Sequence, residues 1–216
     1  GASITIREAT FGSDDPRQFG GGLLIEGVFT SIGTTRTPFV RLAVAPIAGA
    51  TTLTLESAPT GWAAGHVLAL PDSHQWAPAV RPIEENPGSL VPSQYERATI
   101  ASIVGTTVTL TTPLQFAHPQ ATSQDAAIIY RPHVAHVTRS ITITSAAPNG
   151  VRGHVIASDD AALNLQYTAF KDLGRTDWST VALDNGGPNQ KGRYALHLHH
   201  LHHPATIIGN AIDNAL

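Results

Sequence analysis

The stretch Ser140-Ile141-Thr142-Ile143-Thr144 decides the fold class, because isoleucines alternate with small polar residues along it. This alternation predicts a strand with one apolar face. Further strand-like segments recur around and after it with no helix between them, at 136–144, 153–157, 163–170, 194–199 and 206–212. Such repetition predicts an all-β protein built on a right-handed parallel β-helix, whose coils bury their inward residues on one another. Tandem hairpins in a β-sandwich are the alternative.

The residues before this region show a different pattern. Between about 20 and 130, short alternating segments are joined by turns such as Ile103-Val104-Gly105-Thr106, which predicts antiparallel pairing. We therefore expect a β-rich region at 1–133, with a long loop at about 71–95, and parallel coils at 134–216. The 15 prolines and 19 glycines break most helical patterns, so we expect less than about 10% helix.

The composition excludes several classes of function. The formal net charge is -3 and 13% of residues are charged, so we expect no nucleic acid partner. No apolar run approaches the roughly 20 residues of a membrane span, and we expect no membrane insertion. Cysteine is absent, which removes disulfides and thiolate sites. The chain contains no methionine and begins Gly1-Ala2-Ser3, so we expect it to be an internal piece of a longer protein, truncated within its C-terminal coils.

A histidine-rich segment at 194–204 is the main candidate for chemistry. In a strand, residues two apart share a face, so His197 and His199 are predicted to stand side by side. With His154 from an earlier strand as a third ligand, they would bind a divalent transition metal such as zinc, nickel or copper. Two other interpretations stay open: an inert surface row of histidines, and acid–base catalysis without a metal.

Charged residues near the predicted strands are the candidates for catalysis. Arg139 precedes an apolar strand, Arg193 precedes the histidine strand, and Asp172 and Asp177 flank Gly174-Arg175. A pair of carboxylates would support glycoside hydrolysis, whereas a base beside an arginine or a metal would support elimination from a uronate. A cap at a turn or strand end is the simpler interpretation of each aspartate.

Segments in a fixed order cover nearly the whole chain and carry a family resemblance. They are Gly20-Gly21-Gly22-Leu23-Leu24-Ile25-Glu26-Gly27, Gly61-Trp62-Ala63-Ala64-Gly65-His66-Val67-Leu68-Ala69-Leu70, Thr107-Val108-Thr109-Leu110, Pro113-Leu114-Gln115-Phe116-Ala117-His118, Val137-Thr138-Arg139-Ser140-Ile141-Thr142-Ile143, Gly153-His154, Phe170-Lys171-Asp172-Leu173-Gly174, Gly192-Arg193-Tyr194-Ala195-Leu196-His197-Leu198-His199 and Gly209-Asn210-Ala211-Ile212. The chain thereby resembles the extracellular eight-glycine domain and the parallel β-helix that follows it in fibrocystin, the cell-migration-inducing hyaluronan-binding protein, the transmembrane hyaluronidase and secreted bacterial relatives. It departs from them at Ser140, where the family has Asn, at Leu198, where it has an aromatic residue, and in lacking the cysteines of the animal members.

The resemblance implies a location outside the cell or at its surface and a role in handling polysaccharide. On this mapping His154, His197, His199, Arg139 and Arg193 match family positions. We expect binding of an extracellular polysaccharide, and an enzyme of this kind would be a glycoside hydrolase or a polysaccharide lyase. A non-catalytic structural or adhesive β-helix module is the alternative. We also expect the open β edges of the coils to promote self-association.

Overall fold

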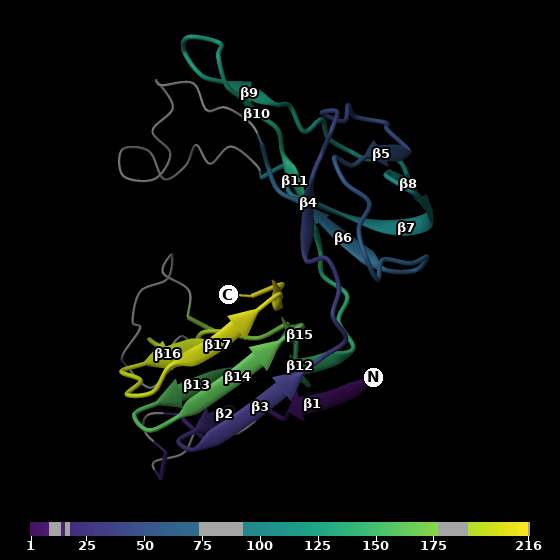
Figure 1. Ribbon diagram of the computed structural model, residues 1–216. Coiled ribbons are helices and arrows are strands. Elements are labelled where there is room, and N and C mark those ends of the chain that lie inside the picture. Colours follow the sequence, from purple (N-terminus) through teal and green to yellow (C-terminus); the bar gives the residue numbers. More distant parts are fainter. Residues whose placement is uncertain (9–13, 16–17, 74–92, 177–189, 216) are drawn as a thin grey trace, which may run out of the picture. The chain divides into compact units, whose positions relative to one another are not determined.

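A computed structural model describes residues 1–8, 14–15, 18–73, 93–176 and 190–215 (Figure 1). Every regular element in these ranges is a β-strand, so the expectation of an all-β chain is confirmed for them. They contain no helix long and apolar enough to cross a membrane. The chain divides into two compact units. We call residues 1–35 with 137–216 the parallel unit, and residues 36–136 the inserted unit.

The parallel unit contains three parallel sheets, and each sheet takes its strands from well-separated parts of the chain. Their orders are β1 (Ala2–Ile6), β12 (Ile141–Ser145), β15 (Thr168–Lys171), β18 (Ala211–Asp213); β2 (Gly22–Ile25), β13 (His154–Ser158), β16 (His197–His199); and β3 (Val28–Ile32), β14 (Ala162–Gln166), β17 (Ala205–Ile208).

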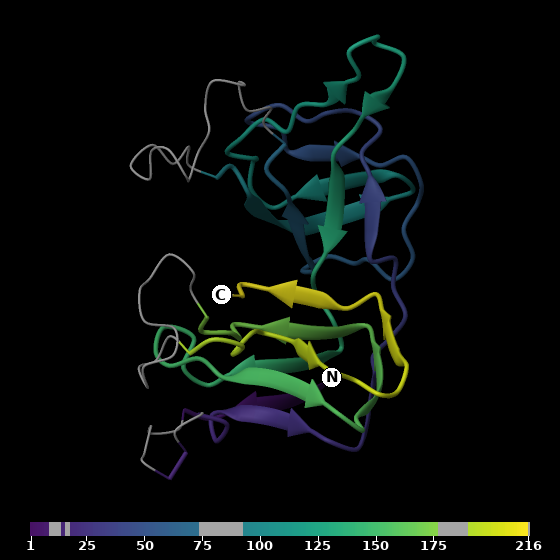
Figure 2. The same cartoon turned by 90° about the vertical axis from the view of Figure 1, so that its left-hand side faces the viewer.

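Successive strands along the chain belong to the first, second and third of these sheets in a repeating order. The chain runs through β1, β2 and β3, then through β12, β13 and β14, and then through β15, β16 and β17 before β18 returns to the first sheet. Each round therefore adds one strand to every sheet, and Figure 2 shows the rounds as stacked layers. Parallel neighbours need a long connection, and here the remaining strands of each round supply it.

The inward side chains of these layers form one apolar core. In β13 the alternation turns Val155 and Ala157 inward, and both are fully buried. Leu163 and Leu165 do the same in β14, and Phe170 in β15 is fully buried in the same cluster. Because each layer covers the apolar face of the next, this stacking buries side chains that a single round would leave in water.

The inserted unit is a six-stranded antiparallel sheet with its own core. Its strand order is β4 (Phe39–Arg41), β11 (His133–His136), β6 (Val67–Leu70), β7 (Glu96–Val104), β8 (Thr107–Leu110), β5 (Thr52–Thr54). A bridge between Leu42 and Leu55 joins the ends of the two outer strands, so the sheet closes on itself. A short ribbon, β9 (Ala121–Thr122) with β10 (Ile129–Tyr130), completes the unit. The core contains Leu53, Leu68 and Ile100 among others.

The observed division differs from the predicted boundary between 133 and 134. Strands β1, β2 and β3 belong to the parallel sheets, although the antiparallel region was expected to include them. The expected antiparallel pairing holds for the described strands of the inserted unit. Most of the expected loop at 71–95 lies outside the described residues. The difference arises because β3 and β12 are neighbours along the rotation, and the inserted unit separates them only in sequence.

Candidate functional site

The outward face of the sheet β2–β13–β16 carries the candidate site. Since Val155 and Ala157 point into the core, His154, Ile156 and Ser158 point outward. Backbone register places Ile156 between Leu24 of β2 and His197 of β16, and places Ser158 beside His199. Parallel pairing thus assembles a row of outward side chains from three distant segments.

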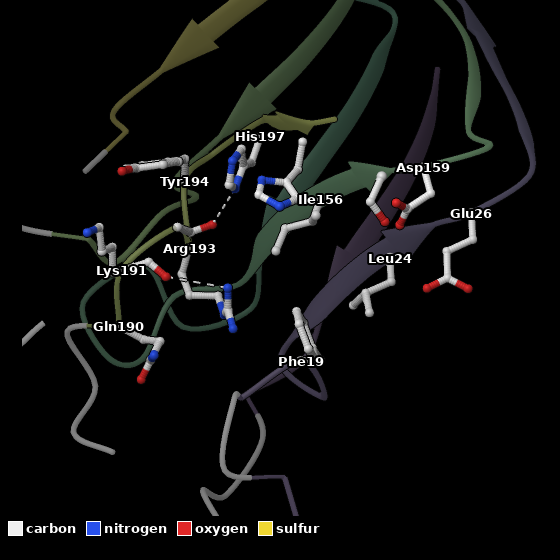
Figure 3. A pocket seen from close by; sticks show the side chains of 13 residues that line it. Phe19, Leu24, Glu26, Ile156, Asp159, Gln190, Lys191, Arg193, Tyr194 and His197 are labelled. Atoms are coloured by element: carbon white, nitrogen blue, oxygen red, sulfur yellow. Dashed lines mark hydrogen bonds between the residues drawn. The ribbon is translucent and has the colours of Figure 1, made fainter. Parts of the chain in front are cut away.

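A cavity of about 770 Å³ lies over this row (Figure 3). The residues that line it are Phe19, Leu24, Glu26, Ile156, Ser158, Asp159, Gln190, Lys191, Gly192, Arg193, Tyr194, His197 and His199. They combine apolar and aromatic groups with cationic, anionic and imidazole side chains. Figure 3 shows Lys191 and Arg193 on one side of the cavity and Asp159 and Glu26 on the other.

His197 is held in one orientation by a backbone carbonyl. Its Nδ1 donates a hydrogen bond to the oxygen of Gly192 at 2.9 Å, which leaves Nε2 as the nitrogen with a lone pair in the neutral ring. The ring centroid lies 5.2 Å from that of Tyr194 and 5.2 Å from that of His199, both with edge-to-face geometry. The rings of His197 and His199 therefore lie next to each other at the cavity, as expected for two residues on one face of a strand.

Arg193 is 6% exposed although its side chain is charged. Its guanidinium carbon lies 4.5 Å from the centroid of the Phe19 ring, and its backbone N–H donates to Thr176 Oγ1 at 3.0 Å. The turn that presents Phe19 is held by Asp15, whose carboxylate accepts from the Phe19 N–H at 2.9 Å and the Gly20 N–H at 2.6 Å. The bond from Gly20 holds the pKa of Asp15 below its usual range, and the positive charge of Arg193 acts in the same direction.

The sequence patterns did not point to Glu26 and Asp159, the two carboxylates that line the cavity. Glu26 directly follows β2 and Asp159 directly follows β13, and these neighbouring parallel strands end side by side. Both residues are exposed, and Asp159 has a positive φ of 51° that turns the chain toward β14. An acidic residue just after a predicted strand was the available signal, but the parallel partner of β2 could not be known from sequence.

His154 does not join the other two predicted metal ligands. It is fully buried, and the Nη1 of Arg175 lies 2.9 Å from its Nδ1. Its register partner is Gly22, where an added Cβ would overlap the imidazole, whereas His197 pairs with Ile156. Burial lowers the pKa of His154 to about 3, and the charges of Arg175 and Arg193 contribute in the same direction. This histidine is thus a neutral, packed side chain.

His197 and His199, the other two predicted metal ligands, supply only part of a metal site. Within the ranges given above, no group of three or more His, Cys, Asp or Glu side chains is arranged to hold a metal ion. His197 and His199 are adjacent imidazoles and could supply two ligands. Any further ligand would have to come from water or another group.

Of the four charged candidates for catalysis, Arg139 and Asp172 are not among the residues that line the cavity. Arg139 donates from Nε to the oxygen of Gly209 at 2.8 Å, and so contacts the turn between β17 and β18. Asp172 has a φ of 56°, and its Oδ1 accepts a hydrogen bond from Asn214 Nδ2 at 2.6 Å. This is the geometry of a turn residue. Arg193 does line the cavity, whereas Asp177 lies outside the described residues.

No protein family model matches the chain, and no curated protein matches it. Three solved tailspike structures are similar to it, with TM-scores of 0.33 to 0.35. The tailspike protein gp49 from Pseudomonas phage LKA1 is 15% identical over 67% of this chain, with a TM-score of 0.33. The tailspike gp61 of Pseudomonas phage phi297 is 13% identical over 96%, with a TM-score of 0.33. The gp54 tailspike of Acinetobacter baumannii bacteriophage AP22, solved with a capsular saccharide, is 12% identical over 98%, with a TM-score of 0.35. The chain spans 22%, 36% and 29% of those three chains, respectively.

Proposed function

We propose that the cavity on the outward face of β2–β13–β16 binds a short stretch of an extracellular polysaccharide. The observation that carries this proposal is the mixed lining of the cavity. Apolar groups such as Phe19, Leu24 and Ile156 match the C–H faces of sugar rings, and the charged groups around them match the hydroxyls. Carboxylates accept hydrogen bonds from hydroxyl groups, while arginine and lysine donate them.

We also propose a handedness for the coils of the parallel unit and a location for the protein. We propose a right-handed parallel β-helix, which is supported by the rotation of the chain through three parallel sheets and by the strong right-handed preference of parallel connections. The ordered resemblance to eight-glycine proteins supports a location outside the cell. A purely structural or adhesive β-helix is the alternative function, and it predicts no saccharide binding at the cavity.

Cleavage of the bound polysaccharide would use the two carboxylates at one side of the cavity. Glu26 and Asp159 emerge from the ends of adjacent strands, and a carboxylate pair is what glycoside hydrolysis requires. One would protonate the leaving glycosidic oxygen while the other activates water or attacks the anomeric carbon. This would make the chain part of a glycoside hydrolase, and released reducing ends would be the direct evidence.

The test is binding of defined oligosaccharides from capsules, cell walls and animal matrix to the full chain, followed by calorimetry on the best ligand. Glu26→Gln and Asp159→Asn should each weaken binding about tenfold, because each substitution weakens hydrogen bonds worth about 1.5 kcal/mol in total. Asp160→Asn is the matched control, since Asp160 is an exposed neighbour that does not line the cavity. Equal affinity in all three variants would contradict the proposed site.

We also propose that His197 and His199 bind a divalent transition metal such as zinc, nickel or copper through their adjacent imidazoles. Zinc at about 100 times its dissociation constant should stabilise the fold by about 2.7 kcal/mol, measured as a rise in Tm. His197→Ala with His199→Ala should remove this rise, whereas His202→Ala with His203→Ala should keep it. A rise that survives the first pair of substitutions would place the metal elsewhere.

A further inference from the structure

The inserted unit begins at Arg36 and ends at His136, and one side chain contacts both of these residues. That side chain is His66, which lies in the turn before β6. The Nη1 of Arg36 lies 3.0 Å from His66 Nδ1 and 2.9 Å from His66 Nε2. The Nε2 of His136 lies 3.0 Å from His66 Nδ1. His66 therefore joins the first and last residues of the inserted unit.

The hydrogen bonds around His66 require an imidazole with a lone pair on Nδ1. The backbone N–H of Ala63 donates to Nδ1 at 3.0 Å, and the Arg36 guanidinium has only donors. His136 then donates from Nε2 to the same nitrogen. A protonated His66 carries a hydrogen on Nδ1 as well as on Nε2, so Nδ1 could no longer accept hydrogen bonds from Ala63, Arg36 or His136.

The surroundings of His66 oppose its positive charge. Burial lowers the pKa of His66 below its usual value near 6.5, and the positive charge of Arg36 lowers it further. Among the residues that the structure describes, the titratable or charged side chains with a recorded contact to His66 are Arg36 and His136. Neither is a carboxylate, so neither would stabilise an imidazolium.

Aromatic packing extends the arrangement beyond the hydrogen bonds. The ring of His136 stacks on Trp62, with centroids 5.3 Å apart and an interplanar angle of 25°. Trp62 donates from Nε1 to the Thr37 oxygen at 2.7 Å. Arg36 also donates to the Gly61 oxygen at 3.3 Å. The turn at 61–66 thus contacts both ends of the inserted unit through hydrogen bonds and ring stacking.

We propose that His66 is an acid-sensitive clasp, which holds the two ends of the inserted unit together and opens when its imidazole takes up a proton. Opening removes the contacts to Arg36, Ala63 and His136 together and releases the ends of β4 and β11. The clasp is closed above about pH 6.5, and the proportion that is open grows as the pH falls below this value.

Amide hydrogen exchange of the full chain at pH 7.5 and pH 5.5 tests this proposal, after correction for the intrinsic rates at each pH. In the wild type, peptides covering 36–42 and 132–136 should exchange about tenfold faster at pH 5.5, because one pH unit below the titration midpoint of the unfolded histidine opens the clasp by about that factor. His66→Gln should show the same exchange at both pH values. His203→Gln, an exposed histidine of the parallel unit, should behave as the wild type.

A second measurement keeps the proposal testable if His66→Gln does not fold. The imidazole of His66 is titrated in the wild-type protein by nuclear magnetic resonance. The clasp requires a midpoint below 6.5. The chemical shift of the Ala63 amide should change over the same pH range, because its hydrogen bond to His66 is lost as the ring titrates. A midpoint at or above 6.5, or a pH step that persists in His66→Gln, would overturn the proposal.

Discussion

Burial decides the protonation of a histidine more strongly than its neighbours in sequence do. His154 is fully buried under the guanidinium of Arg175, whose Nη1 also donates to the Arg152 oxygen at 2.9 Å. The pKa of Arg175 is itself lowered to about 10 by burial, with the charge of Arg193 as a further cause. A neutral His154 can accept from Arg175 and avoids adding a third buried cation.

This arrangement predicts acid sensitivity in the parallel unit. An unfolded histidine takes up a proton near pH 6.5, whereas folded His154 does so near its lowered pKa of about 3. The unfolded state therefore binds more protons between these values, so stability is fully present above pH 6.5 and declines as the pH falls toward 3. The loss is at most about 5 kcal/mol.

The measurement is the free energy of unfolding in urea at several pH values between 7.5 and 4. His154→Gln should flatten the decline, because glutamine does not titrate. His199→Gln is the control and should retain the slope of the wild type, since His199 is exposed. Parallel curves for the wild type and His154→Gln would contradict a buried neutral histidine at this position.

Strand β14 divides its side chains between the core and the surface of the parallel unit. Leu163 and Leu165 are buried, while Asn164 and Gln166 point outward and hydrogen-bond to each other at 2.8 Å. The outward face of β13 departs from this division, because His154 is outward and yet fully buried. The Arg175 side chain and the absence of a side chain at Gly22 make that burial possible.

Gly22→Ala tests how tightly β2 and β13 are packed at this point. The added Cβ would overlap the His154 imidazole, which Arg175 holds from the other side. We expect a loss of about 2–3 kcal/mol in the free energy of unfolding, as for other overpacked sites. Gly27→Ala is the matched control, because a Cβ there meets nothing within 4 Å, and it should change stability by less than about 1 kcal/mol.

The three parallel sheets end in outer strands, each of which has one partner strand among the described residues. Within the strands that the structure describes, β1, β2 and β3 are outer strands at one end of their sheets, and β18, β16 and β17 are outer strands at the other. Val28 of β3 is 85% exposed, and Ile207 and Ile208 of β17 are also exposed. Unpaired edges with apolar side chains favour pairing with further strands.

We therefore predict that the isolated chain self-associates through these edges. Sedimentation velocity should show a larger species whose proportion rises with concentration. Val28→Lys should shift the equilibrium toward monomer by about tenfold, because a lysine on an edge strand opposes pairing. Val104→Lys is the control, since Val104 of the inserted unit is 79% exposed but lies outside the parallel sheets. A monomeric wild type at all concentrations would contradict the prediction.

The local alternation of apolar and polar residues was sufficient to predict which of these segments form strands. The alternation in 140–144 corresponds to β12, and the segments at 153–157 and 163–170 correspond to β13, β14 and the start of β15. His197 and His199 were predicted to share a face, and both line the cavity. These features depend on residues close in sequence, because a strand turns successive side chains to opposite sides whatever lies beside it.

Only the tertiary structure decided which strands became neighbours. Nothing local to β2 indicates that Leu24 lies beside Ile156, or that Glu26 and Asp159 emerge at the same end of two strands. The same holds for His154, whose register partner is Gly22 rather than a residue of β16. Parallel pairing joins segments far apart in the chain, so its register is set by the packing of whole layers against one core, and a sequence read segment by segment does not contain that information.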